Sequence, residues 1–72
     1  MTNFLILTNT DSDHESVMDI VRKRSLTFNN RFGGPGHCDT EVIGSPSDYK
    51  VFKEAIENGI IKGELEILSG EL

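Results

Sequence analysis

Two segments with the apolar period of an α-helix, residues 10–25 and 45–61, are each flanked by segments with the apolar pattern of a β-strand. One face of the first helical segment carries His14, Val17, Met18 and Val21. The apolar stripe of the second consists of Tyr49, Phe52, Ala55 and Ile56. Each helical segment thus lies between two predicted strands, with short connections, and this order leaves few possible folds.

The first helix has a capping signal and a matching distribution of charge. Ser12 is followed three residues later by Glu15, which is the spacing of a capping box, so we expect Ser12 to be the N-cap. The acids of residues 11–15 oppose the positive end of the helix dipole, and the bases of residues 22–24 suit its negative end. We therefore assign both clusters to helix electrostatics and not to a calcium or magnesium site, whose acids would be spread differently.

The second helix is bounded at both ends. Ser45 is a natural N-cap, Pro46 suits the first helical position, and Asp48 lies at the third. Residues 58–59, Asn-Gly, end the helix because glycine adopts the left-handed conformation that follows a helix without a steric penalty.

Four segments are predicted to be strands: residues 4–9, 26–32, 39–44 and 63–68. The first has apolar residues on both faces, as a central strand should, with Phe4 and Ile6 on one face and Leu5 and Leu7 on the other. The last alternates Leu65 and Ile67 with Glu64 and Glu66, so one of its faces should be wet. The third strand has the weakest pattern.

The predicted order is β-α-β-β-α-β, and 72 residues allow only one domain, residues 1–72. The simplest α+β fold with this order is a ferredoxin-like sandwich, in which two helices cover one face of a four-stranded antiparallel sheet. Since the helices cover one face only, one apolar pair of the first strand should be exposed. Exposed apolar surface usually marks an interface, so we expect Leu5 and Leu7 to meet a partner protein or a second copy of the chain.

A glycine-rich loop, residues 31–39, lies between the second and third strands. Gly34-Pro35-Gly36-His37 fits a type II turn, with proline fixing φ at the second position and glycine accepting positive φ at the third. Phosphate-binding loops instead present backbone N–H groups at a helix N-terminus, and here a strand follows. We favour a hairpin turn; the alternative is a small-molecule or nucleotide site formed by Gly33, Gly34, Gly36 and His37.

Candidate metal-binding and catalytic residues are few. Cys38 is the only cysteine, so no disulfide can form within the chain, and the histidines are His14 and His37. Structural zinc usually takes four ligands in paired spacings, which this sequence lacks. His37 and Cys38 are neighbours on a strand and should point to opposite faces. We therefore expect no catalytic residues, no metal and no cofactor, with a metal-dependent hydrolase as a third, less favoured function.

The charge is acidic and unevenly distributed. Residues 1–40 carry five acids and four bases, whereas residues 41–72 carry seven acids and three bases, so the second part holds −4 of the net −5. A nucleic-acid-binding protein would show a basic stripe, so we expect no direct nucleic-acid contact. The absence of a signal-like or membrane-spanning segment predicts a cytoplasmic protein without a membrane partner.

These features favour a small stand-alone protein-binding module, an inhibitor or modulator of a larger and basic partner, as phage and mobile-element accessory proteins often are. Complementary charge of this kind steers encounter between proteins. The expected partner-binding residues are the two leucines and the acids of the second helix and the last strand: Leu5, Leu7, Glu54, Glu57, Glu64, Glu66 and Glu71. A homodimer through the open sheet face is a further expectation.

Overall fold

The computed structural model describes residues 1–70 and contains the predicted order of elements. They are β1 (Thr2–Thr8), α1 (Asp11–Lys23), β2 (Thr27–Gly34), β3 (His37–Gly44), α2 (Pro46–Glu57) and β4 (Gly63–Gly70). The strands are somewhat longer than the apolar patterns indicate, because the turn residues at their ends also pair. No strand boundary differs from its predicted position by more than two residues; β3, for example, begins at His37 and not at Asp39.

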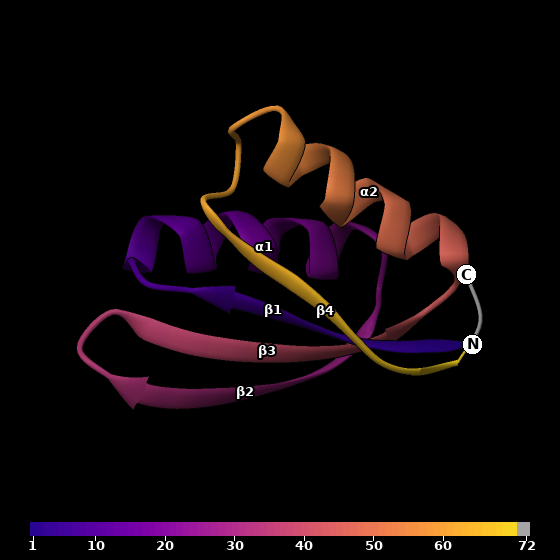
Figure 1. Cartoon of the computed structure of the whole chain (residues 1–72), viewed down its shortest axis with the longest axis horizontal. Helices are drawn as coiled ribbons and strands as arrows, with labels where there is room; N and C mark the ends of the chain where they lie inside the picture. The colour runs from indigo at the N-terminus through magenta and orange to yellow at the C-terminus, as the bar shows by residue number, and fades with distance from the viewer. Residues whose placement is uncertain (71–72) are drawn as a thin grey trace.

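The four strands form one sheet in the order β2-β3-β1-β4, and each neighbouring pair is antiparallel. Both helices lie on the same side of this sheet (Figure 1). The predicted ferredoxin-like sandwich is therefore confirmed, and β1 is a central strand as its two apolar faces require. Among the described residues, no helix is long and apolar enough to cross a membrane.

The core lies between the sheet and the helices. Its largest side chains are at most 1% exposed and come from every layer: Phe4, Ile6, Val17, Val21, Val42, Phe52 and Ile61. The ring of Phe4 packs edge-on against Phe52 and Tyr49 of α2, with centroids 5.6 and 5.4 Å apart. These contacts fix α2 above β1, and since α1 lies on the same side of the sheet (Figure 1), the opposite face of β1 receives no helix.

The start of α2 has the predicted capping box. Ser45 Oγ accepts a hydrogen bond from the Asp48 N–H at 3.1 Å, and Asp48 Oδ2 accepts one from the Ser45 N–H at 2.8 Å. Arg24, just after α1, donates from Nε to Asp48 Oδ1 at 2.6 Å. Burial raises the pKa of Asp48, but the bonds from Ser45 and Arg24 outweigh it and leave that pKa below its usual value. Asp48 thus joins the two helices.

The start of α1 corrects the prediction. Its N-cap is Thr10, whose Oγ1 accepts from the Asp13 N–H at 3.1 Å, while Ser12 lies inside the helix. Asp13 Oδ2 accepts from the Thr10 hydroxyl at 2.6 Å, and Asp13 Oδ1 accepts from the backbone N–H of Lys62 at 2.9 Å. The Thr10 hydroxyl and the Lys62 N–H together lower the pKa of Asp13. Thr10 and Asp13 have the same three-residue spacing as Ser12 and Glu15, so local spacing alone did not distinguish the two possible caps, and the Lys62 contact adds a bond to the cap that forms.

Two glycines adopt the conformations that the sequence predicts. Gly59 follows the C-cap Asn58 of α2 and has a φ of +76°. Gly36, in the two-residue turn between β2 and β3, has a φ of +75°, as the third position of a type II turn requires. The hairpin turn is confirmed at this position.

Candidate functional site: the open face of the sheet

The two faces of β1 have different environments. Phe4 and Ile6 are fully buried beneath the helices, and Leu5 and Leu7 lie half-buried on the opposite face. That face, the open face, carries no helix (Figure 1). Of the two apolar pairs in β1, Leu5 and Leu7 are therefore the pair left without a covering layer, as the alternation predicts.

The strand register surrounds these two leucines with carboxylates. Directly opposite residues of an antiparallel pair share a face, so the neighbours of each leucine follow from the pairing. Leu5 lies between Glu41 of β3 and Glu66 of β4, and Leu7 lies between Asp39 and Glu64. The open face therefore contains a short apolar centre with two acids on each side, and the exposed Ile43 of β3 lies on the same face.

The positive groups of this face are Arg31 and, when protonated, His37. Arg31 of β2 lies opposite Asp39 in the register. His37 Nε2 lies 2.9 Å from Asp39 Oδ1, and its Nδ1 lies 2.8 Å from Asn9 Oδ1. Asp39 Oδ1 has no hydrogen-bond partner among the described residues, so its contact with His37 is an ion pair only when the imidazole is protonated, whereas Nδ1 is within hydrogen-bond distance of Asn9. Arg31 and His37 both lie beside Asp39, and the other three acids, Glu41, Glu64 and Glu66, make the rest of the face acidic.

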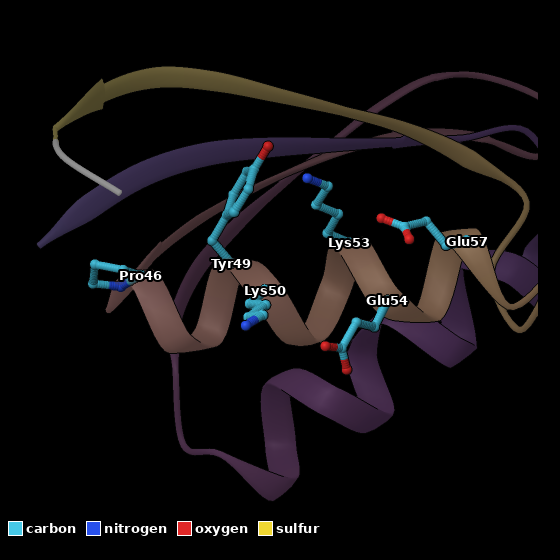
Figure 2. A pocket seen from close by; sticks show the side chains of 6 residues that line it. All are labelled: Pro46, Tyr49, Lys50, Lys53, Glu54 and Glu57. Atoms are coloured by element: carbon cyan, nitrogen blue, oxygen red, sulfur yellow. The ribbon is translucent and has the colours of Figure 1, made fainter.

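The structure divides the acids that the sequence grouped together. Glu64 and Glu66 are exposed on the open face, whereas Glu54 and Glu57 are on α2, in the layer on the other side of the sheet. Figure 2 shows Glu57 and Lys53 on the strand-facing side of α2 and Glu54 on the side facing α1. Together with Tyr49 they line a shallow hollow of about 380 Å³. Glu71 lies outside the described residues.

Asp39 and Glu41 belong to the open face but were absent from the predicted partner-binding residues. Alternation along β3 buries Cys38, Thr40 and Val42 on the helix side, which places the odd-numbered residues on the other. The period-two pattern could have identified both acids. The pattern did not indicate that β3 pairs with β1, because the weak apolar alternation of β3 gave no sign that it is a central strand of the sheet.

The glycine-rich loop packs against the chain itself. A Cβ on Gly36 would lie 2.7 Å from the backbone oxygen of Asn9, and one on Gly33 would lie 2.9 Å from Cδ2 of His37. Both distances are shorter than side-chain contacts allow, so each of these glycines permits a close approach inside the molecule. The loop is thus held against the β1–α1 connection by Gly36 and by the His37–Asn9 contact.

The environments of the histidines and of the cysteine bear on catalysis and metal binding. Cys38 is 1% exposed on the helix side of β3, and His37 points away from it, as predicted. His14 is half-buried, and its ring lies edge-on to Phe32 at 5.5 Å. Within residues 1–70, no three His, Cys, Asp or Glu side chains are grouped so that they could hold a metal ion.

Comparisons of the chain with protein-family models, with curated proteins and with solved structures gave no match.

Proposed function

We propose that this protein is a protein-binding module whose open face docks on a basic surface of a larger protein and thereby inhibits or modulates it. The observation that carries the proposal is the arrangement of the leucines of β1 between four carboxylates. An apolar centre surrounded by charge resembles the organisation of protein interfaces, in which a dry core is enclosed by a polar rim.

The sign of the charge indicates the kind of partner. Asp39, Glu41, Glu64 and Glu66 would repel the phosphates of a nucleic acid, and they would attract lysine and arginine side chains. The complementary surface is therefore a basic patch with an apolar residue near its centre. Leu5 and Leu7 would supply affinity by leaving water, and the acids would supply orientation and speed of encounter.

The test compares three forms of the protein as baits in a pull-down from the native cytoplasm. They are the wild type, the double reversal Glu64→Lys/Glu66→Lys on the open face, and the double reversal Glu54→Lys/Glu57→Lys on α2. Each reversal changes the net charge from −5 by +4, to −1. Their total charge is therefore matched, and only the location of the change differs.

We expect the α2 reversal to retain the captured partner and the open-face reversal to lose it, with both variants folded by circular dichroism. A Leu7→Asp variant should also lose the partner, because it places a charge in the apolar centre. Equal capture by all folded baits would contradict docking through the open face. Equal loss in both reversals would assign the effect to net charge alone.

A further inference from the structure

The two edge strands of the sheet, β2 and β4, differ in the charge of their side chains. An edge strand presents a row of unpaired backbone N–H and C=O groups, and proteins commonly protect such edges with charged side chains. The β4 edge carries Glu64 and Glu66. The β2 edge carries no acid, and its one charged residue is Arg31. In a protein of net charge −5, β2 is therefore the edge without carboxylates.

The side chains of β2 also leave apolar surface uncovered. Phe28 and Phe32 lie on the helix side of the sheet, since they pair with Val42 and Cys38 of β3, yet they are 45% and 72% exposed. Between them, Asn30 is turned inward and accepts a hydrogen bond from Thr40 at 2.8 Å. The edge thus offers two exposed phenylalanines at a spacing of four residues, beside backbone groups that an extended segment can pair with.

We infer that the occupant of this edge is β2 of a second copy of the chain, paired antiparallel about Asn30, so that two sheets join into one. In this register Phe28 lies opposite Phe32 of the second copy, and Asn29 lies opposite Arg31 of the second copy. Both phenylalanine pairs then form on the helix side, where aromatic cross-strand pairs add stability. The arrangement has two-fold symmetry, as most dimers do.

Neighbouring registers are worse for physical reasons. With the axis at Asn29, Phe28 would face Asn30 of the second copy, and the paired phenylalanines would be lost. With the axis at Arg31, the two arginines would lie directly opposite each other, which is destabilising. Charge also argues for a second copy at this edge: two chains of net charge −5 repel least where neither presents a carboxylate.

The symmetry has a consequence for the open face. Because the axis is perpendicular to the sheet, the open faces of both copies lie on the same side of the joined sheet. The leucines and acids of the two copies therefore form a repeated surface. This dimer does not depend on the proposed function, because its contacts involve β2 and not the leucines and acids at the centre of the open face.

Two opposite changes at one residue test the inference. Asn29→Arg would place a cation opposite Arg31 of the second copy, and Asn29→Glu would place an anion there. Each contact occurs twice, so the dimer dissociation constant should rise roughly 2- to 30-fold for the first variant and fall by a similar factor for the second. Dissociation constants are measured by sedimentation equilibrium with the full chain.

Changes in monomer stability or in net charge would shift the dimer dissociation constants in the opposite direction, so neither can produce the expected result. Within one chain, residue 29 lies opposite Glu41, so the arginine variant should be the more stable monomer. It is also the less negative variant and should self-associate more readily if only net charge mattered. Ser69→Arg and Ser69→Glu, on the exposed β4 edge, make the same charge changes and should leave the dimer unchanged.

A monomeric wild type over the whole concentration range would overturn the inference. So would equal weakening by both Asn29 variants, because that result places Asn29 opposite itself. A response to the Ser69 variants as large as that to the Asn29 variants would move the contact away from β2 and would also overturn it.

Discussion

Gly36 and Gly59 have nearly the same backbone φ, +75° and +76°, in different surroundings. A Cβ on Gly59 would meet no atom within 4 Å, whereas one on Gly36 would lie 2.7 Å from the Asn9 carbonyl oxygen. Gly59→Ala should therefore lose about 1 kcal/mol of unfolding free energy through φ alone. Gly36→Ala should lose more, since the backbone of residue 9 must also move.

Urea unfolding of both alanine variants measures this difference. If residues 33–37 form only a turn and contact no partner, partner binding by Gly36→Ala should fall in proportion to the folded fraction. A stable Gly36→Ala protein that no longer binds its partner would instead make residues 33–37 a binding site.

Asp48 couples stability to pH. Its folded-state pKa is lowered, because the bonds from Ser45 and Arg24 outweigh burial. A lowered pKa means that this stabilisation is complete above the unfolded value of about 3.9 and is lost as pH falls through the folded value. Asp48→Asn should therefore lose about 1–2 kcal/mol near pH 7, and its difference from the wild type should shrink below pH 4.

The matched control is Asp19→Asn. Asp19 also accepts from an arginine, Arg22, at 2.8 Å, but its side chain is 63% exposed. Exposed pairs contribute little, so this variant should change the unfolding free energy by less than about 0.5 kcal/mol. Chemical denaturation at several pH values compares the two variants. Similar losses of unfolding free energy at Asp19 and Asp48 would contradict a special contribution from the buried Asp48 carboxylate.

At the scale of an element, the start of α1 distinguishes a local pattern from the contact that forms. Thr10→Ala removes the hydroxyl that accepts from the Asp13 N–H and should lose about 1 kcal/mol. Ser12→Ala removes the hydroxyl that the sequence pattern selects, and it should have almost no effect, because Ser12 is exposed inside the helix. Thermal and urea unfolding should rank the two variants in this order. The opposite ranking would move the cap back to Ser12.

At the scale of the whole molecule, the proposed function predicts kinetics. Association with the captured partner should slow several-fold as salt rises to physiological levels, where the Debye length is about 8 Å. Glu64→Lys/Glu66→Lys should lower the on-rate, and Glu54→Lys/Glu57→Lys, with the same net charge, should lower it less. Stopped-flow measurements decide this. If neither salt nor the open-face reversal changes the on-rate, the acids contribute to solubility only.

Local patterns predicted much of this fold. The Ser45–Asp48 capping box, the glycine after α2 and the two-residue hairpin turn all depend on residues within a few positions of one another. The order of elements then favoured one fold, because short connections between alternating strands and helices leave few ways to cover a sheet. Alternation in β1 also predicted that Leu5 and Leu7 lie on the opposite face from Phe4 and Ile6.

The candidate site needed the tertiary structure, because it depends on which strands are neighbours. Only the register places Asp39 and Glu41 beside Leu7 and Leu5, and only the layers separate Glu54 and Glu57 from Glu64 and Glu66. The sequence by itself determined what each segment becomes, since hydrogen bonds within a segment follow local chemistry. The tertiary structure decided what meets what, since pairing between distant segments is set by the packing of the whole chain.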